Sequence, residues 1–273
     1  CKIRTQKSKH GFCPVQDPCF DLSARRGGRA VMEKEKQVCL SPRLQLLADL
    51  VPQESCIADI GTDHGYLPLW LIQQNKIFSA IACDVREGPL DHARRSAVQY
   101  GVKEKLSFRL GNGLSCIQPQ EVDTIIIAGM GGETILSILG AAPWVNAPAY
   151  RVLLQPMTKA EVLRPWLAEQ GYRFVEEHLV YENHTYFPVM VVSGGNTPET
   201  LTAGQCWGGV SLLHDPLQGK ALEMLLRHLS AALTGLMQSN HPENRAKARA
   251  QHALIAQLQQ MKEEWHRAND KRN

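Results

Sequence analysis

The stretch CIADIGTDHGYLPLWL, residues 56–71, begins as a buried strand and continues as a helix. Its apolar run ends at Ile60, and a short loop bounded by Gly61 and Gly65 follows. In parallel α/β sheets, ligands bind beyond the carboxyl ends of the strands, where such loops lie. The stretch therefore predicts an α/β fold with a ligand site at this loop.

Strand-like and helix-like segments alternate around this stretch. An earlier helix has Pro42 in its first turn, and two β-rich runs that meet around residues 182–184 (Glu182, Asn183, His184) indicate an antiparallel hairpin. Five parallel strands followed by a hairpin are typical of the class I, Rossmann-like methyltransferase fold, which we therefore expect. Strands are predicted at 56–60, 78–83, 106–110, 123–128 and 150–155, and helices at 66–75, 88–100, 131–140 and 158–170.

The two ends of the chain differ from this α/β domain, which we expect to span residues 39–199. Residues 1–38 are rich in Lys, Arg, Gly and Cys without periodicity, so we expect a disordered extension, and a natural start at Met32 stays an open alternative. After the low-complexity break SGGNTPETLTAGQCWGG, residues 200–273 predict an α-helical hairpin domain of coiled-coil type. Its apolar stripes are Leu222, Leu225, Leu229, Ala232 and Leu236, then Leu254, Leu258, Met261, Trp265 and Ala268, with Pro242 starting the second helix.

Composition excludes several classes of protein. A net charge of +3 on 273 residues is too small for a polybasic nucleic-acid binder, although the basic excess lies at the two ends. The eight cysteines form no C-x-x-C pair and no Cys/His cluster, so we expect no metal, and Cys56 and Cys83 are expected as free thiols in a reducing compartment. No apolar stretch is long enough to span a bilayer and no signal peptide is visible, so we expect a cytoplasmic protein without a membrane partner.

The loop after the first strand departs from the dinucleotide pattern G-x-G-x-x-G, because Asp63 stands where the second glycine would be. A carboxylate there would repel a pyrophosphate and favour a cationic or zwitterionic ligand, such as the sulfonium and amino groups of S-adenosylmethionine. Asp59 supplies an acidic strand end, while Gly61 and Gly65 allow the backbone to approach closely. A tight turn in which the aspartate caps a helix is the alternative. His64 is a functional candidate because it adjoins Asp63.

Three later strand ends carry suitable residues in the order that such a cofactor site needs. Asp84 stands where an acid contacts ribose hydroxyls, and a plain helix N-cap is its alternative. Asn112 can hydrogen-bond an adenine edge while Gly113 lets the base approach, although an Asn-Gly turn without a ligand is the alternative. Residues 129–132, GMGG, replace the D/N-P-P-Y tetrad of amino-directed adenine methyltransferases, which favours a ring nitrogen as nucleophile; close packing of helix and strand is the alternative.

Five motifs in this order resemble the bacterial tRNA (adenine-22, N1)-methyltransferases, the TrmK family. They are LSPRLQLLADLVP, ADIGTDHGYLP, GNGL, DTIIIAGMGGETILSIL and LLQPMTKAEVLRPWL, and the similarity runs from about residue 40 to residue 195, with a similar helical tail. The resemblance implies transfer of a methyl group from S-adenosylmethionine to N1 of a tRNA adenine in the D-arm region. By position, the cofactor would be held by Asp59, Gly61, Asp63, Gly65, Tyr66, Asp84, Val85, Asn112, Gly113, Gly129 and Met130.

Adenine N1 carries an available in-plane lone pair, so positioning should dominate the transfer. The methylated ring is cationic, and Asp63 is our candidate for stabilising that charge or receiving the N6 proton, with His64 as helper. The target base must be extruded from folded tRNA, so the RNA must be held elsewhere. Arg245, Lys247 and Arg249 of the basic tail are the expected tRNA contacts, with a solvated helix face as the alternative. A monomer is favoured.

Other functions stay open at this point. The chain could methylate another RNA base or a DNA base, or it could be a catalytically silent member of the fold that binds RNA through its tail. Intact Asp59, Asp63 and Asp84 argue against the silent protein. A nicotinamide dehydrogenase is disfavoured by the missing middle glycine.

Overall fold

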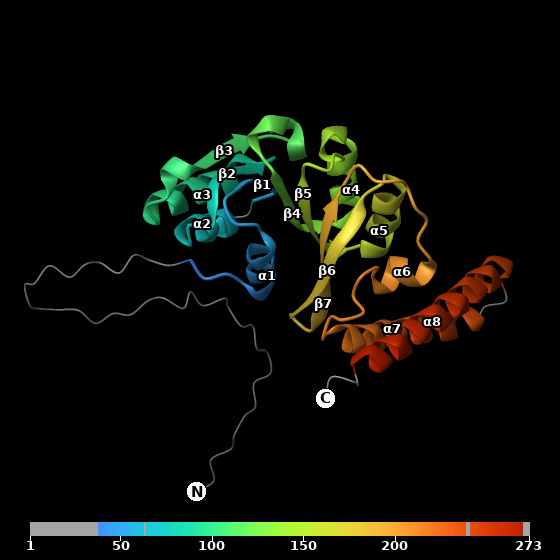
Figure 1. Cartoon of the computed structure of the whole chain (residues 1–273). Coiled ribbons are helices and arrows are strands. Elements are labelled where there is room, and N and C mark those ends of the chain that lie inside the picture. Colours follow the sequence, from blue (N-terminus) through green and yellow to red (C-terminus); the bar gives the residue numbers. More distant parts are fainter. Residues whose placement is uncertain (1–37, 63, 239–240, 270–273) are drawn as a thin grey trace, which may run out of the picture. The chain divides into compact units, whose positions relative to one another are not determined.

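The computed structural model describes residues 38–62, 64–238 and 241–269 (Figure 1). Its centre is a seven-stranded sheet of order β3-β2-β1-β4-β5-β7-β6. The strands β1 to β5 pair in parallel, whereas β7 is antiparallel to both β5 and β6. The class I methyltransferase fold predicted from the sequence is therefore confirmed. The strands are β1 (Ser55–Ile60), β2 (Ile77–Asp84), β3 (Leu106–Leu110), β4 (Thr124–Gly131), β5 (Arg151–Thr158), β6 (Arg173–Glu182) and β7 (Thr185–Ser193).

Helices cover both faces of this sheet, which explains the uninterrupted apolar runs of its inner strands. Ile125, Ile126 and Ile127 of β4 are all fully buried, because a parallel strand packed between two helical layers has no solvent-facing side. The helices α1 (Pro42–Leu50), α2 (Tyr66–Gln73) and α3 (Glu87–Gln99) pack on one face. The other face carries α4 (Gly132–Gly140) and α5 (Ala160–Glu169). Short 3-10 turns η1 (Lys103–Lys105), η2 (Gly113–Cys116), η3 (Pro119–Glu121) and η4 (Pro143–Val145) complete this part.

The glycine-rich segment after the fourth predicted strand is not the open turn that its composition suggests. Strand β4 continues to Gly131, three residues beyond the predicted end at 128, and β5 continues to Thr158 beside it. The ladder pairs Ala128 with Gln155 and then Met130 with Pro156, so Gly129 forms a bulge between them. Its φ of 73° lies in the left-handed region, which favours glycine at the bulge.

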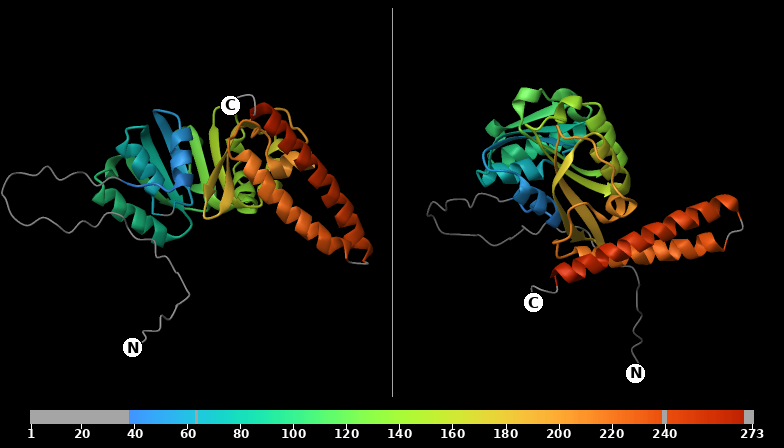
Figure 2. Two further views of the ribbon diagram at one scale, coloured as in Figure 1. Left: turned by 90° about the horizontal axis from the view of Figure 1, so that it is seen from below. Right: turned by 45° about the vertical axis from the view of Figure 1, so that its right-hand side comes forward.

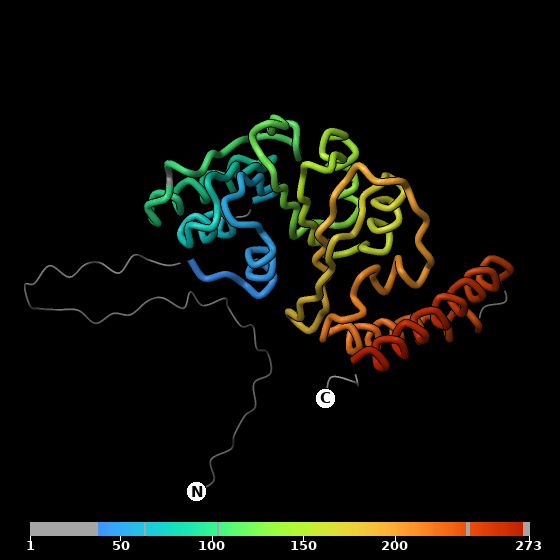
Figure 3. Tube along the Cα trace, in the orientation of Figure 1, coloured from blue at the N-terminus to red at the C-terminus, as the bar shows by residue number. Residues whose placement is uncertain are grey.

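The chain leaves the β6–β7 hairpin through a short helix, α6 (Ala203–Gly208), and then forms two long helices, α7 (Gln218–Met237) and α8 (Pro242–Asn269) (Figure 3). The segment 193–209 was expected to be a low-complexity break: residues 194–202 form neither helix nor strand, but Ala203–Gly208 forms α6, which was not predicted. Thr202 accepts a hydrogen bond from Gln205 N while the Gln205 side chain accepts from Thr202 N, a capping box that starts the helix.

Helices α7 and α8 lie side by side along their length (Figure 2). Their contact is best buried near the start of α7, where Leu222 meets Leu254 and Leu258. One member of the predicted stripe is wrong: Ala232 is exposed, and the adjacent Leu233 is partly buried instead. The two helices and the other four residues of the first stripe are as predicted, and only the position of this one residue differs.

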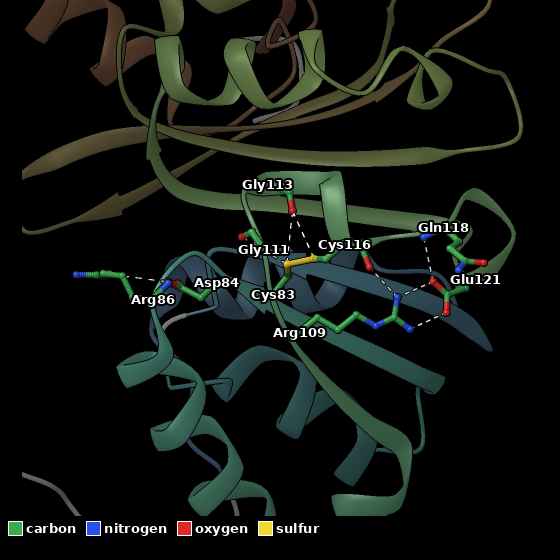
Figure 4. The surroundings of a disulfide bond; sticks show 9 residues. All are labelled: Cys83, Asp84, Arg86, Arg109, Gly111, Gly113, Cys116, Gln118 and Glu121. Carbon is green, nitrogen blue, oxygen red and sulfur yellow. Dashed lines mark hydrogen bonds and ion pairs between the residues drawn. A yellow bond between two sulfur atoms is a disulfide. The ribbon is translucent and has the colours of Figure 1, made fainter.

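A disulfide joins Cys83 at the end of β2 to Cys116 in η2 (Figure 4). We expected Cys83 to be a free thiol, and that expectation is wrong. The turn after β3 folds back onto β2, and Gly111 permits this approach because a Cβ on it would lie 2.7 Å from Cys116 Cβ. Cys56 keeps a free, half-buried thiol. The inference of a reducing compartment thereby loses the support of Cys83.

Two searches of the described residues complete this outline. Among residues 38–62, 64–238 and 241–269, no helix is both long and apolar enough to cross a membrane. Within the same ranges, no three His, Cys, Asp or Glu side chains gather closely enough to hold a metal ion.

Candidate functional site

The carboxyl ends of β1, β2, β3 and β4 surround a cavity of 150 Å³. Loops that follow the parallel strands meet here because all four strands end at the same edge of the sheet. Six of the residues predicted from the sequence line it: Gly61, Asp84, Val85, Asn112, Gly113 and Met130. The other lining residues are Ile60, Cys83, Gly111, Thr134, Ser137 and Ile138.

The backbone after β1 forms one wall of this cavity. Gly61 N and Thr62 N both donate to Cys83 O, at 2.8 and 3.1 Å, so the loop continues the pairing of β1 with β2 for two residues. Gly61 has a φ of 76°, and a Cβ built on it would lie 2.0 Å from Met130 Cε. Glycine is therefore required by both conformation and space, and Met130 lies directly over the loop.

Two polar groups of the β1 end are buried beneath the loop. Asp59 is 7% exposed, and burial raises the pKa of its carboxyl to about 6, with the nearby charge on Asp84 raising the pKa further. The hydroxyl of Thr62 is buried and has no hydrogen-bond partner among the described residues. Buried polar groups of this kind are costly until a ligand or water satisfies them. The β1 end is thus suited to a ligand that brings positive charge and hydrogen-bonding groups.

Asp84 ends β2 and is 7% exposed at the cavity wall. Its Oδ1 accepts from Arg86 N at 2.8 Å, and the Arg86 guanidinium lies 3.8 Å from the same oxygen (Figure 4). Helix α3 begins after Arg86 and has no side-chain cap, so the helix N-cap alternative for Asp84 is not what the structure contains. Its neighbour Val85 is 66% exposed at the rim.

The turn after β3 brings Asn112 and Gly113 to the cavity. Gly113 has a φ of 59°, and a Cβ on it would lie 2.9 Å from Ile138 Cγ2 of α4. The close approach of this turn to α4 therefore requires glycine. Figure 4 shows how the disulfide holds the same turn against β2.

The remaining predicted residues lie elsewhere. Asp63 lies outside the described residues. His64 stacks on Tyr66 at 5.4 Å between ring centroids and meets His92 edge-on at 5.2 Å, and none of these rings lines the cavity. Gly65 caps α2 in the left-handed conformation. Asp59 and Gly129 lie beside the cavity's lining residues in sequence without lining it themselves.

Sequence reasoning missed one whole wall of the cavity. Thr134, Ser137 and Ile138 all come from α4, and their spacing of three and four places them on one helical face. That periodicity was visible in the sequence, but an apolar helix next to a strand is usually assigned to core packing. Thr62, whose hydroxyl is buried beside the loop, was also not among the predicted residues.

The three basic residues predicted to contact RNA all lie exposed near the start of α8. Successive helical residues are rotated by about 100°, so Arg245 and Arg249 share one face while Lys247 lies on the opposite side. The structure thus brings together two of the three.

The chain is similar to several known proteins. Residues 40–190 match a family described as a methyltransferase domain. The tRNA (adenine(22)-N(1))-methyltransferase of Bacillus subtilis (strain 168) is 37% identical over 157 residues, which span 58% of this chain and 66%, just under two thirds, of that relative. The crystal structure of a candidate tRNA (m1A22) methyltransferase from Streptococcus pneumoniae has a TM-score of 0.74 at 32% identity, covering 82% of this chain and 100% of that one. M. capricolum TrmK in complex with the cofactor product S-adenosyl-homocysteine has a TM-score of 0.70 at 27% identity, with coverage of 82% and 98%.

Proposed function

Because the chain belongs to the TrmK family of tRNA (adenine(22)-N1)-methyltransferases, we propose that it methylates N1 of adenine 22 in tRNA, using S-adenosylmethionine. The observation that carries the proposal is the cavity at the carboxyl ends of β1 to β4, where a buried acid, an Asn-Gly turn and a glycine-rich strand end converge. These three features come from three different strand ends, and together they suit the ribose, the adenine and the methyl-bearing sulfonium of a nucleoside-containing cofactor.

The residues around the cavity fit S-adenosylmethionine. The buried carboxylate of Asp59 and the unsatisfied hydroxyl of Thr62 suit a ligand with positive charge and polar groups. Asp84 has a second carboxylate oxygen available for ribose hydroxyls, and Asn112 with Gly113 suits the adenine edge. When bound, the cofactor supplies an electrophilic methyl group on sulfur, which adenine N1 attacks with its in-plane lone pair as the carbon–sulfur bond breaks.

The chain's own contribution to the reaction is positioning and charge. A carboxylate at Asp63 stabilises the cationic methylated ring or receives a proton from N6, and His64, held by Tyr66 and His92, helps to orient it. The GMGG end of β4 has no side chain that could grip an exocyclic amine, which supports a ring nitrogen as the nucleophile. These roles are proposals that rest on the family and on the chemistry of the product.

The tRNA contacts are assigned to the helical part of the chain. We propose a catalytic domain over residues 39–199 and a tRNA-binding domain over residues 200–273, with Arg245 and Arg249 on the phosphate-facing side of α8 and Lys247 as a further contact. The enzyme acts as a monomer in the cytoplasm, where tRNA is modified. Light scattering in solution tests the monomer.

The test is to incubate the protein with unmodified tRNA and S-adenosylmethionine labelled in the methyl group, then digest the tRNA and identify the nucleosides by mass spectrometry. Labelled 1-methyladenosine at position 22 is expected, and a tRNA with guanine at position 22 is the matched control. Label in another nucleoside, or in a DNA oligonucleotide, would favour the alternative of a different base. No label in any nucleic acid would favour a silent RNA-binding protein.

A further inference from the structure

A buried glutamine stands next to the bulge of β4. Gln155 of β5 is 1% exposed, and its Oε1 accepts from Gly129 N at 3.2 Å. The backbone ladder between β4 and β5 skips Gly129, so the glutamine side chain supplies the acceptor that the neighbouring strand does not. Gly129 itself is exposed, but its acceptor comes from a buried side chain, and this bond therefore holds the bulge in one conformation.

The other end of the carboxamide is also fixed. Gln155 Nε2 donates to Pro156 O at 3.1 Å and lies 3.6 Å from Met157 Sδ. With both ends of the amide engaged, the side chain cannot rotate away from Gly129 without breaking several contacts. The orientation of the acceptor is therefore set by β5 itself.

Arg43 of α1 reaches the same acceptor. Its Nη1 donates to Gln155 Oε1 at 3.3 Å, its Nε pairs with Glu182, and its guanidinium lies 5.3 Å from the centroid of the Phe187 ring. Helix α1 and the β6–β7 hairpin are thus connected to the β4 bulge through one side chain. The motifs LSPRLQ and LLQPM, which lie 112 residues apart at these two positions, meet here.

The bulge determines where the next residue lies. Met130 follows Gly129 directly, lines the cofactor cavity and lies over Gly61. A change in the backbone of Gly129 would therefore move Met130 relative to the cofactor and to a base entering beside it. Displacements of about 1 Å in positioning groups can reduce turnover by about 100-fold.

We propose that Gln155 is a positioning residue for methyl transfer, which acts with Arg43 by holding the β4 bulge so that Met130 and Gly131 present the target adenine to the methyl group. This proposal rests on the proposed function. Gln155 touches neither the cavity nor the reacting atoms, so its effect passes through Gly129.

The experiment compares three variants of the full chain. Gln155→Leu keeps the size of the side chain and removes the acceptor, whereas Gln155→Glu keeps an acceptor for Gly129 N and Arg43. Thr124→Val is the matched control, because Thr124 is a buried polar residue at the opposite end of β4, bonded to Asp123. Turnover, the KM for tRNA, S-adenosylmethionine affinity and the NMR signal of the Met130 methyl group are measured for each.

For Gln155→Leu we expect kcat to fall about 10- to 100-fold while cofactor affinity stays within about threefold. Gln155→Glu should recover at least several-fold in kcat over the leucine variant, and the Met130 signal should move in Gln155→Leu but not in Thr124→Val. A folded Gln155→Leu protein with wild-type kcat and an unmoved Met130 signal would overturn the proposal. Equal losses in Thr124→Val would also overturn it, because they would indicate general destabilisation.

Two further outcomes separate this proposal from the function on which it rests. A wild-type protein without methyltransferase activity would refute the proposed function, and the Met130 signal would still report whether Gln155 holds the bulge. If Gln155→Leu fails to fold, the comparison of Gln155→Glu with wild type decides: an unchanged Met130 signal and kcat within about threefold support the acceptor role. A collapse of kcat in a folded Gln155→Glu protein would contradict it.

Discussion

Asp84 stands at the cavity wall with one carboxylate oxygen already bonded to Arg86 N. Replacement by alanine should weaken S-adenosylmethionine binding by about 1–3 kcal/mol, the cost of leaving a polar partner without its bond. Calorimetric titration of the folded variant measures this directly. Arg86→Ala is the matched control, because the Arg86 side chain is 77% exposed and should contribute little. Unchanged affinity in Asp84→Ala would remove Asp84 from the ribose role.

Asp59 should make the free energy of unfolding fall as pH rises, which is the reverse of the usual effect of a carboxyl group. Burial raises the pKa of its carboxyl from 3.8 to about 6, so the folded state holds a proton that the unfolded state has lost between these values. The stabilising contribution is therefore complete below about pH 4 and is lost as pH rises through about 6. At about 1.4 kcal/mol per pKa unit, the cofactor-free protein should lose about 3 kcal/mol of stability over this range.

Urea unfolding of wild type and Asp59→Asn at pH 4.5 and pH 7.5 checks this prediction. The asparagine variant should be the more stable of the two at pH 7.5, and the difference should shrink at pH 4.5. Glu121 provides a control of opposite sign, since its hydrogen bond with Arg109 lowers the pKa of its carboxyl to about 2. If wild type and Asp59→Asn respond to pH in parallel, the buried carboxyl is not the cause.

At the scale of elements, one buried ion pair ties the end of the sheet to the helical part. Arg164 of α5 and Glu177 of β6 are 3% and 0% exposed and bond at 2.8 Å. Arg164 Nη1 also donates to Cys206 O in α6, and Glu177 accepts from Val210 N and Ser211 N. The pair therefore connects a helix, a strand and the connection that leads into α7.

Replacing Arg164 by methionine should destabilise the protein by about 3–5 kcal/mol, because it leaves the carboxylate of Glu177 buried without its cation. Arg151→Met is the matched control: Arg151 pairs with Glu176 at 2.6 Å, but these side chains are 29% and 38% exposed, so the loss should be about 1 kcal/mol or less. Denaturant unfolding measures both. Similar losses in the two variants would show that burial of the Arg164 pair is not decisive.

The sheet was predictable because strands that are buried on both faces have continuous apolar runs, such as TIIIA at residues 124–128. The extension of β4 through Gly129 was not predictable, because a glycine there normally indicates a turn, whereas the strand continues through backbone pairing with β5 and the bond from Gly129 N to the Gln155 side chain. Helix α6 was not predicted because its segment is rich in Gly and Thr, although Thr202 and Gln205 have the spacing of a capping box. The Cys83–Cys116 pair could not be predicted, because two cysteines 33 residues apart meet only after the sheet is assembled.

Some residues of the candidate site could also be predicted from the sequence, and others could not. Gly61, Asp84 and Asn112 were predictable because each follows a strand, and strand ends of a parallel sheet converge. The α4 wall with Thr134 and Ser137 depends on how that helix is rotated against the sheet, which is decided by packing on distant residues such as Leu163. Sequence patterns therefore predict the strand ends at a ligand site more readily than they predict the helix that forms its other wall.

At the scale of the whole molecule, the basic start of α8 is expected to bind the phosphates of tRNA. Arg245→Ala with Arg249→Ala should weaken tRNA binding and reduce the slope of log affinity against log salt by about one unit per lost contact. Cofactor affinity should stay unchanged, because all residues lining the cavity precede Gly140. Binding across a salt series measures the effect.

The controls use the other charges of the same hairpin. Lys262→Ala should have little effect, since Lys262 already pairs with Glu223 at 2.8 Å. Lys247→Ala should cost less than the double variant, because it lies on the opposite side of α8. Equal affinities and slopes for wild type and the double variant would leave the basic residues as a solvated helix face.

The α7–α8 pair is hydrogen-bonded to the preceding segment through residues in the second half of α8. Gln257 Oε1 accepts from Gly204 N, Trp265 Nε1 donates to Asp215 O, and Asn269 donates to Leu213 O. Apart from these bonds, the main packing partner of α8 is α7. Seven residues added to each helix would carry Arg245 and Arg249 outward by about 10 Å at 1.5 Å per residue and leave the cavity untouched. If the proposed tRNA contacts on α8 are correct, the length of the helix pair would set how far from the reacting base the RNA is held, independently of the residues that line the cavity.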